Sequence, residues 1–480
     1  MSRTSRRQFL QTSLAASAVF STFTIAGTKS SGKVIGANGT IRVAVAGING
    51  RGKSHIEGFA GQKNVQITHL ADPDSRLFDS RSDMVKKIGK NDPTCVQDFR
   101  TVLDDPNIDV LTIATPNHWH ALMTILACQA GKDVYVEKPC SHNIHEGRVA
   151  VEAARKHGRI VQHGTQNRSG KVGLEAAELA KSGKAGKLLV SRGLCYKKRN
   201  SIGTKPNEQA PAELDYSLWL GPAAEHPFNK NFVHYNWHWF WDFGNGDIGN
   251  QGVHQMDLAR WGIPGATWPT KVTSWGGRFG YKDQAETANT QVTVMEFGDV
   301  QLIFEVRGLP SDNYYRQGVG NTYEFEDGIL ASGKFYPKGS TEPVDPPAKS
   351  KVKRGPGKDH FGNFIAAVRS RNIEDLNADI LEGHYSSGLC HLANASYRLG
   401  QEMPFDAYKQ AFGESSAAGQ TVARMGEHLT KNGVKLDGLQ CHVGPSLQFD
   451  TEKEQVVGNA DANTILTGKY REPFTLPSLG

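Results

Sequence analysis

A charged pair at the end of an apolar strand is the first feature of this sequence that could carry chemistry. Residues 133–139 read D-V-Y-V-E-K-P, so Glu137 and Lys138 follow a buried strand and Pro139 ends it. Parallel sheets present their binding groups at the carboxyl ends of strands, and a lysine there can stabilise developing negative charge. Taken alone, the pair is also typical of a solvated surface ion pair. Its neighbours must decide between the two interpretations.

A glycine-rich turn near the start predicts a phosphate-binding site. The strand-like stretch 41–46 runs into G-I-N-G-R-G, and a helix that begins after this turn would point its N-terminus at a bound phosphate. Asn49 stands where the usual fingerprint has its middle glycine, and we expect it to take the left-handed conformation that asparagine tolerates. The predicted cofactor contacts of the turn are Gly47, Asn49, Gly50, Arg51 and Gly52.

A carboxylate after the second strand favours NAD as the cofactor. The strand 65–71 ends in Asp72, about 25 residues after the first glycine of the turn, where an acid accepts hydrogen bonds from an adenosine ribose. Only Arg76 stands close by to balance a 2′-phosphate against Asp72 and Asp74, so NADP is disfavoured. The alternative role of Asp72 is a cap for a helix at 75–87.

Alternating strands and helices up to residue 164 predict a parallel, doubly wound sheet, which makes the fold class α/β. A strand at 110–114 leads into T-P-N-H-W-H, and a strand at 160–163 leads into G-T-Q-N-R. In such a sheet these strings share one edge with the glycine turn and with Lys138. On that edge we expect further cofactor contacts from Thr115, Pro116, Asn117, His120, Glu137, Lys138 and Gln166.

Beyond residue 165 the pattern changes to that of an α+β domain with an open, mostly antiparallel sheet and helices on one face. We predict a strand at 188–196, a hairpin of 289–297 and 300–306, and a helix that begins near Gly249. The predicted domains are a Rossmann domain at 41–164, a substrate-binding domain at 165–405 and a tail at 406–480 that packs on the outside.

Composition excludes several classes of protein. A length of 480 residues indicates two or three domains. The net charge of +6 is scattered, which gives nucleic-acid binding little support. The six cysteines show no C-x-x-C spacing, so neither a disulfide framework nor a thiolate zinc site is indicated. No stretch after the N-terminus is long and apolar enough for stable membrane insertion.

The N-terminus predicts export. Residues 5–11 read S-R-R-Q-F-L-Q, a twin-arginine pattern, and the apolar run 14–25 that follows is too short to span a membrane. We predict a signal peptide at 1–26, with cleavage near Ala26 or Ala18, and a spacer at 27–40. The protein would then use the twin-arginine (Tat) export machinery and reach the periplasm or cell envelope. A disordered basic tail is the alternative.

Four motifs in order resemble the Gfo/Idh/MocA family, whose members include glucose-fructose oxidoreductase and inositol dehydrogenase. They are the glycine turn, T-P-N-H-W-H at 115–120, E-K-P at 137–139 and G-x-H-x-x-D-x-A-R-W at 252–261. The resemblance runs from about Ile41 to about Pro473. It implies a bound nicotinamide cofactor, a sugar or cyclitol substrate, and a C-terminal sheet that often joins subunits into homo-oligomers.

The resemblance also implies catalytic roles. Lys138 matches the family lysine that contacts substrate and nicotinamide ribose, and His254 matches the histidine that removes or returns the alcohol proton. The family often has an aspartate four residues before that histidine, where this chain has Asn250. An amide can orient a hydroxyl but cannot exchange its proton. Asp247 and Asp257 are candidate substitutes, although Asp257 could instead fix the His254 tautomer.

An aromatic run at 235–243 has two interpretations. Trp237, Trp239 and Trp241 alternate, which suits one face of an extended segment in a core, whereas sugars also stack on such rings. The predicted substrate contacts are Lys138, Arg168, Tyr235, Trp241, Asp247 and His254. His234 and His238 could approach a metal together with His254, but no acid or thiolate completes a usual set, so we predict no metal.

Export constrains the reaction, because a folded protein outside the cytoplasm has left the soluble NAD(H) pool. We therefore expect an oxidoreductase that transfers hydride to or from a sugar, a cyclitol or a sugar derivative with a tightly retained cofactor. One alternative is an NAD-dependent glycosidase that oxidises, eliminates, hydrates and reduces its substrate within one cycle. A second is a non-catalytic sugar-binding or scaffold protein.

Overall fold

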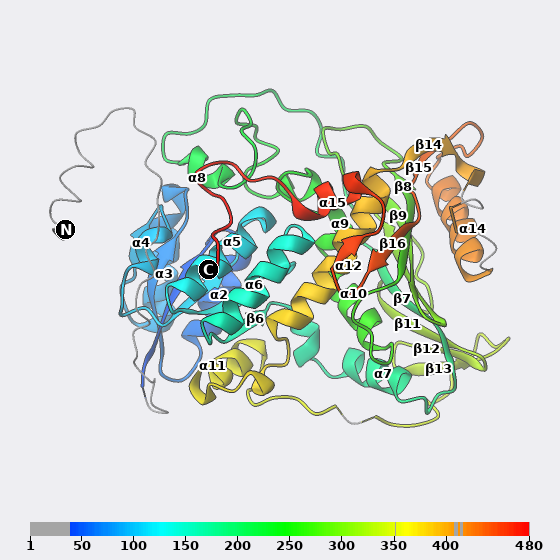
Figure 1. Ribbon diagram of the computed structural model, residues 1–480, viewed down its shortest axis with the longest axis horizontal. Coiled ribbons are helices and arrows are strands. Elements are labelled where there is room, and N and C mark those ends of the chain that lie inside the picture. Colours follow the sequence, from blue (N-terminus) through cyan, green and yellow to red (C-terminus); the bar gives the residue numbers. More distant parts are fainter. Residues whose placement is uncertain (1–38, 351, 408–410, 413–415, 480) are drawn as a thin grey trace.

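The computed structural model describes residues 39–350, 352–407, 411–412 and 416–479. The predicted signal peptide at 1–26 lies outside these residues. The described chain forms two sheets with helices packed around them, one built from the N-terminal part and the other from the C-terminal part (Figure 1). Among the described residues, no helix combines the length and apolarity needed to cross a bilayer.

The N-terminal sheet has the strand order of a dinucleotide-binding fold. All its pairs are parallel, in the order β3-β2-β1-β4-β5-β6. The strands are β1 (Ile41–Ala46), β2 (Val65–Ala71), β3 (Thr94–Val96), β4 (Val110–Ile113), β5 (Asp133–Val136) and β6 (Val161–His163). The helices are α2 (Arg51–Ala60), α3 (Phe78–Gly89), α4 (Arg100–Leu103), α5 (Asn117–Gln129) and α6 (Ile144–Lys156). The predicted parallel, doubly wound sheet is confirmed.

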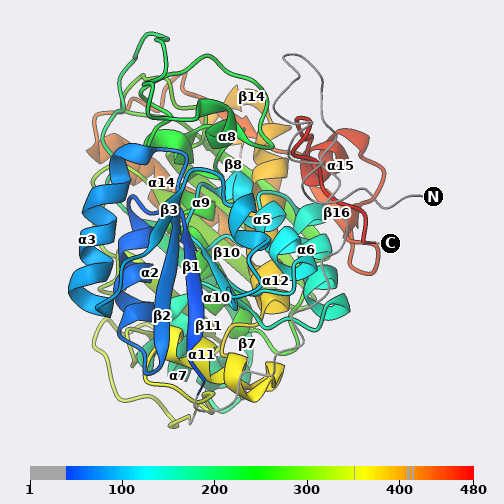
Figure 2. The ribbon, with the colours of Figure 1, turned by 90° about the vertical axis from the view of Figure 1, so that its left-hand side faces the viewer.

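Alternation along β1 explains why helices cover both faces of this sheet. Val43 and Val45 belong to the core beneath α2 and α11 (His360–Ser370), whereas Ala44 and Ala46 belong to the core beneath α5. Successive strand residues point to opposite faces, so a strand with apolar residues on both faces must be covered twice. Figure 2 shows α2 and α3 on one side of the strands and α5 and α6 on the other.

The C-terminal sheet is open and mostly antiparallel, as predicted. Its main path is β13-β12-β11-β7-β10-β9-β8-β15-β14, in which β7 and β10 are parallel and the other named pairs are antiparallel. Its strands are β7 (Leu188–Tyr196), β8 (Lys271–Gly277), β9 (Thr290–Phe297), β10 (Val300–Arg307), β11 (Val319–Phe325), β12 (Gly328–Ala331), β13 (Lys334–Pro337), β14 (Gln401–Pro404), β15 (Gln440–Val443) and β16 (Leu447–Asp450), with β17 (Gln455–Val456) beside β16. The hairpin of β9 and β10 turns at Gly298, at a φ of +60°.

Helices cover both faces of this sheet, whereas the sequence predicted helices on one face. Phe304 packs toward α10 (Gly252–Trp261) and α12 (Ile380–Arg398), whereas the adjacent Ile303 shares a core with α14 (Ser416–Lys431). The predicted tail also does more than pack on the outside, because β15 and β16 both pair with β8. The other helices of this half are α7 (Val172–Lys181), α8 (Tyr216–Leu220), α9 (Gly246–Gly249) and α15 (Ala460–Thr467).

Candidate active site

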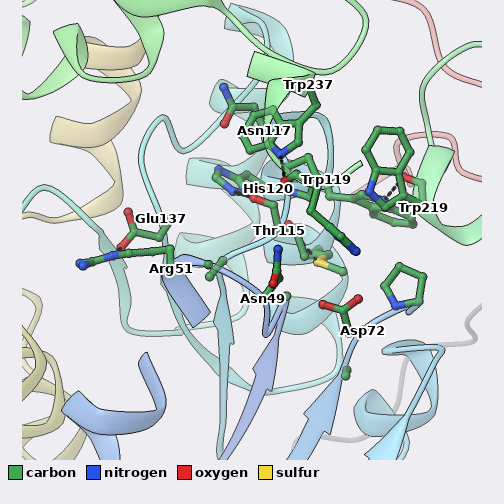
Figure 3. Close-up of a pocket in the computed structure, with 18 of the residues that line it drawn as sticks. Asn49, Arg51, Asp72, Thr115, Asn117, Trp119, His120, Glu137, Trp219 and Trp237 are labelled. Atoms are coloured by element: carbon green, nitrogen blue, oxygen red, sulfur yellow. Dashed lines mark hydrogen bonds and ion pairs between the residues drawn. The ribbon is translucent and has the colours of Figure 1, made fainter. Parts of the chain in front are cut away.

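A cavity of about 300 Å³ opens at the carboxyl edge of the Rossmann sheet, where residues of both sheets' domains line it. In Figure 3, Glu137 and Arg51 lie on one side of the cavity, Trp119 and Trp219 on the other, and Asn49 and Asp72 between them. Most of the predicted cofactor contacts line this cavity: Gly47, Asn49, Gly50, Arg51, Asp72, Thr115, Pro116, Asn117, His120, Glu137 and Lys138. Gly52 and Gln166 lie just outside it.

The glycine turn brings the N-terminus of α2 to the cavity, but by a different residue than expected. Gly47 takes the left-handed conformation, at a φ of +78°, and Asn49 does not, so that expectation was wrong. A Cβ at Gly47 would lie 2.6 Å from the Ala114 carbonyl carbon, and one at Gly52 would lie 2.0 Å from the Gly47 oxygen. These two glycines let the turn, strand and helix pack closely.

Two orphaned donors show that the cavity suits a dinucleotide. Arg51 Nη2 and Asn117 Nδ2 are buried without a hydrogen-bond partner, and both residues line the cavity. A Cβ built on Gly50 would meet nothing within 4 Å, so this backbone faces open space at the start of α2. Phosphate and amide oxygens of NAD could accept from these donors, next to the positive end of the helix.

Two roles were considered for Asp72, a ribose acceptor and a helix cap, and the cap is provided by its neighbour Asp74. Asp74, and not Asp72, caps the turn at 75–77, where it accepts from Arg76 N at 3.1 Å. Asp72 is buried at the cavity wall, where it accepts from Ile48 N at 2.9 Å and from Asp74 N at 3.0 Å. The Arg76 guanidinium forms a fork on Asp74, at 2.7 and 2.6 Å. That pairing disfavours a 2′-phosphate here.

Glu137 is the centre of a buried charge cluster. Its Oε1 accepts from Arg51 Nε at 2.7 Å and contacts His55 Nε2 at 3.1 Å and Gln166 Nε2 at 3.4 Å. Burial alone would raise the pKa of Glu137, but the His55 hydrogen bond and the Arg51 charge hold it well below its usual range. His55, a buried residue of α2, also belongs to this cluster, and the sequence analysis did not select it.

Lys138 reaches across to the second domain. Its Nζ donates to both the backbone oxygen and Oδ1 of Asn250, at 3.0 Å each. Desolvation lowers the pKa of Lys138 to about 8, because the nearby Glu137 carboxylate offsets only part of the cost of burying the ammonium. The peptide bond between Lys138 and Pro139 is cis. Asn250 therefore holds a lysine ammonium whose pKa lies close to neutral pH.

Asn250 can accept from this lysine because the chain breaks there. A helix beginning near Gly249 was predicted, whereas the structure has the short helix α9, a break at Asn250 (φ −89°, ψ −86°), and α10 from Gly252. The break leaves the backbone oxygen of Asn250 outside helical pairing, where Lys138 reaches it. His254 follows on the first turn of α10, and its Nδ1 lies 3.4 Å from Thr165 Oγ1.

His254 is a neutral base in this environment. Desolvation lowers its pKa to about 3, and the charge of Lys138 adds to this. The ring is therefore uncharged at neutral pH and can accept a proton. It does not line the cavity described above, although Lys138 and Asn250 do.

Asp257 and Arg168 form a separate, buried ion pair. Arg168 Nε donates to both Asp257 oxygens, at 3.0 and 2.8 Å, and its Nη2 donates to Oδ1 at 2.8 Å. Ser386 Oγ also donates to Asp257 at 2.7 Å. The carboxylate is thereby occupied, and the hydrogen bond of the His254 ring goes to Thr165 instead.

The other predicted substrate residues are dispersed. Asp247 is buried and held by the Arg199 guanidinium, at 2.6 Å from Nη2. Tyr235 lines the cavity and is 56% exposed. Trp241 lies in a second cavity of about 390 Å³, which His142 and Arg398 also line. The structure therefore brings Tyr235, but not Trp241 or Asp247, to the wall of the first cavity.

The aromatic run is not extended, so the predicted extended conformation was wrong, although two of its three tryptophans are buried as a core role requires. Residues 236–239 form a 3-10 helix, and His238 stacks on Trp237 with ring centroids 3.6 Å apart. Trp237 and Trp239 are both buried, and Trp237 and His238 also line the cavity. Trp119 and Trp219 also line the cavity, although neither was among the predicted site residues. Nothing in the local pattern marks Trp219, because tertiary packing alone brings α8 to the Rossmann edge.

Comparison with known proteins assigns the chain to a family. The model of an oxidoreductase family's NAD-binding Rossmann fold matches residues 41–165, and the model of that family's C-terminal alpha/beta domain matches residues 189–426. The chain belongs to the Gfo/Idh/MocA oxidoreductase family. Together with the cavity at the glycine turn, the match to the NAD-binding model confirms NAD as the cofactor.

Curated relatives resemble only part of this Gfo/Idh/MocA protein. A glycosyl hydrolase family 109 protein of Shewanella pealeana is 30% identical over 135 residues, which cover 27% of this chain and 30% of that protein. A protein of the same description from Solibacter usitatus is 33% identical over 129 residues, covering 25% and 30%. The chain thus spans less than a third of the length of these relatives.

Solved structures share the two-domain fold over about three quarters of this chain, at low identity. The WlbA dehydrogenase of Bordetella pertussis, in complex with NADH and UDP-GlcNAcA, has a TM-score of 0.54 at 18% identity, over 73% of this chain and 94% of that one. The aldose-aldose oxidoreductase of Caulobacter crescentus, complexed with glycerol, has a TM-score of 0.52 at 15% identity, over 75% and 98%. These neighbours support the two-domain fold.

Proposed function

We propose that this Gfo/Idh/MocA protein is an exported oxidoreductase that transfers hydride between a sugar, cyclitol or sugar derivative and a tightly retained NAD(H), with Lys138 and His254 as its catalytic pair. The observation that carries the proposal is the Lys138 ammonium at the cavity wall, held by Asn250 at 3.0 Å and with its pKa lowered to about 8. A cation in that position can polarise a substrate hydroxyl.

The chemistry divides between three side chains. NAD, when bound, accepts or returns the hydride of a carbinol carbon. The carbinol proton must leave as the hydride leaves, so a neutral base is required, and the low pKa of His254 keeps its ring in the accepting form. Lys138 stabilises the negative charge that develops on the substrate oxygen. Asn250 orients the lysine and can orient a hydroxyl, but it moves no proton.

Export by the twin-arginine route, to the periplasm or cell envelope, is the part of the proposal that explains cofactor retention. The S-R-R-Q-F-L string at 5–10 supports it. A protein separated from the soluble NAD(H) pool must regenerate its cofactor on the enzyme, by reducing a second substrate or by returning hydride to the first. A fluorescent reporter fused after residue 40 should appear in the periplasm, and an Arg6→Lys, Arg7→Lys leader should keep it in the cytoplasm.

The reaction is tested with purified protein and a panel of sugars and sugar acids. Absorbance at about 340 nm follows reduction of the bound cofactor, and denatured extracts identify that cofactor. A sugar that reduces it, with reoxidation by a second sugar, supports the proposal. Protein that binds a sugar yet shows neither reduction nor turnover with any member of the panel contradicts it and favours a binding or scaffold role.

A glycosidase cycle is the second candidate. The similarity to glycosyl hydrolase family 109 proteins favours it, although that match covers only 27% of this chain at most among the relatives described above. Release of an aglycone from a nitrophenyl glycoside, without net change in bound NADH, would select this cycle. Incorporation of deuterium from the solvent at the carbon next to the oxidised one would support this cycle independently.

A homo-oligomer through the C-terminal sheet belongs to the same proposal. α14 already packs on the strands around Ile303, which leaves the region of β11 to β13 for a partner. There, Tyr315, Glu324 and Tyr336 line a broad groove. Light scattering of the purified protein checks the assembly, and a monomer at micromolar concentration would contradict it.

A further inference from the structure

A segment of the second domain lies across the adenosine end of the cofactor cavity. We call residues 211–222, which contain α8, the strap. Its start is fastened to the turn after β2, where Asp72 lies. An antiparallel bridge between Asp74 and Leu214 holds it there through two backbone hydrogen bonds, Asp215 N to Pro73 O at 2.9 Å and Ser75 N to Glu213 O at 3.1 Å. Gln97 Nε2 adds a third contact, to Glu213 O at 3.1 Å.

The middle of the strap rests on α5. Trp119 Nε1 donates to the carbonyl oxygens of Leu218 and Trp219, at 3.1 and 3.2 Å. The side chains of Leu218 and Trp219 both line the cavity. Trp219 is only 3% exposed and stacks on Tyr216 at 5.8 Å, so its ring is fixed. A Cβ on Gly221 would lie 2.2 Å from the Trp119 ring, which shows how closely the strap is seated.

The C-terminal segment fastens the far end. Arg471 Nη2 donates to Ser217 O at 2.7 Å, its Nε donates to Gly221 O at 3.0 Å, and its backbone N–H donates to Pro222 O at 3.0 Å. Phe474 then packs on Trp119, with ring centroids 5.3 Å apart. Figure 1 shows this segment running from α15 past α8. Three stretches far apart in the sequence therefore close one wall.

From this geometry we infer that the strap is part of the NAD site, with Leu218 and Trp219 contacting the adenosine half, and that it retains the dinucleotide between turnovers. The inference rests on the proposed function in one respect, the retained cofactor. Asp72 and Pro73, at the turn to which the strap is fastened, line the same cavity. Adenosine bound beside the strap is released only when the strap opens, and opening breaks contacts to the turn after β2, to α5 and to the C-terminal segment together.

Two substitutions loosen the strap without touching Lys138 or the glycine turn. Gly221→Ala forces its backbone away from Trp119, and Arg471→Ala removes three side-chain hydrogen bonds to Ser217 and Gly221. Arg155→Ala is the matched control, because Arg155 pairs with Asp379, away from the strap. The three variants and the wild type are loaded with NADH, and its release into excess NAD is followed by energy transfer from tryptophan.

We expect release of NADH about tenfold faster, or more, in Gly221→Ala and Arg471→Ala, which corresponds to about 1.4 kcal/mol of lost retention. The Arg155→Ala variant should match the wild type. The amount of nicotinamide cofactor that co-purifies, measured in denatured extracts, should be lower in both strap variants than in the wild type and Arg155→Ala. If Gly221→Ala does not fold, Arg471→Ala decides, since the Arg471 side chain is partly exposed and its removal forces no backbone shift.

Equal release rates in wild type and both folded strap variants would overturn the inference. Because release is measured without sugar, this outcome is separate from the fate of the proposed function. A protein that retains NADH through the strap but acts on no sugar keeps the inference and loses the sugar oxidoreductase. A protein that oxidises sugars only with added NAD, and releases it freely, loses the strap and keeps hydride transfer.

Discussion

Two buried cations near the junction of the domains show how differently the same chain treats a charge. Lys138, just after β5, reaches an amide, and Arg168, in the turn after β6, reaches a carboxylate. Arg168 makes three hydrogen bonds of 2.8 to 3.0 Å to Asp257 and another to Glu382 at 3.0 Å. Within the described part of the chain, the Lys138 ammonium donates to the two oxygens of Asn250 alone.

The difference separates a structural charge from a chemical one. Burial opposes ionisation of Asp257, but the Arg168 charge holds the pKa of that carboxyl below its usual value. The lysine has no comparable partner at Asn250, and its pKa falls to about 8. A fully paired ion stays charged and fixes an interface, whereas an under-compensated one near its titration point can serve catalysis. Their partners are close in sequence, because Asn250 is the break before α10 and Asp257 lies within α10.

The largest effect should come from removing the unpaired cation. We expect Lys138→Met to lower the rate of hydride transfer by about a thousandfold, because the developing alkoxide loses its charge partner. Binding of NADH, measured by tryptophan quenching, should persist. Lys86→Met, an exposed lysine paired with Asp92, is the control. Near-normal turnover in Lys138→Met would make the two cations alike and the site assignment wrong.

The paired cation should act on stability instead. Asp257→Ala leaves Arg168 buried without its main partner, and we expect a loss of about 3 to 5 kcal/mol in the free energy of unfolding. Urea denaturation measures it. Replacing both residues, as Arg168→Met with Asp257→Leu, should restore much of the loss, because an apolar pair needs no solvation. A stable Asp257→Ala protein with a selectively reduced kcat would instead place Asp257 in catalysis.

Exchanging the partner types would sharpen the contrast. Asn250→Asp puts a carboxylate where the amide now accepts from Lys138 at 3.0 Å. An opposite charge favours the ammonium, so the lysine pKa should rise by about one unit or more. If the protonated lysine is the active form, the wild-type rate falls as pH rises through about 8, and the variant keeps its rate to higher pH. Asn250→Ala adds no charge and should not move that limb upward.

The smallest expected effect concerns His254. Because desolvation lowers the pKa of His254 to about 3, its ring stays neutral from pH 5 to 7. The rate should therefore show no dependence on His254 titration in that range. A steady-state pH profile over that range checks this. An acidic limb near pH 6.5 that disappears in His254→Asn would show that the histidine is solvated during turnover.

The motifs of the Rossmann half were predictable because their geometry is local. The strand, glycine turn and helix at residues 41–60 follow from alternation and from two small residues, and the E-K-P end of β5 follows from the order of β/α units. The predicted left-handed Asn49 failed because the close approach to Ala114 assigns the strained position to Gly47. Such a contact between separate strands leaves no mark in the local sequence.

Beyond residue 165 prediction was weaker. The hairpin of β9 and β10 was found, since a strand pattern flanked by Gly298 and Asp299 encodes it. One of the two interpretations of the aromatic run made it extended, yet residues 236–239 form a 3-10 helix in which Trp237 stacks on His238. The break at Asn250 was also missed, because the residues around it read as one helix.

By itself the sequence determined the fold class, the family and the residues of the glycine turn and of the E-K-P triplet, all of which depend on spacing along the chain. Only the tertiary structure decided which cation is paired and which wall closes the cavity. Asp257 meets Arg168, and Trp219 meets the Rossmann edge, across long separations in sequence. Pairing energies depend on distance and solvation in space, and these arise only when the chain is packed.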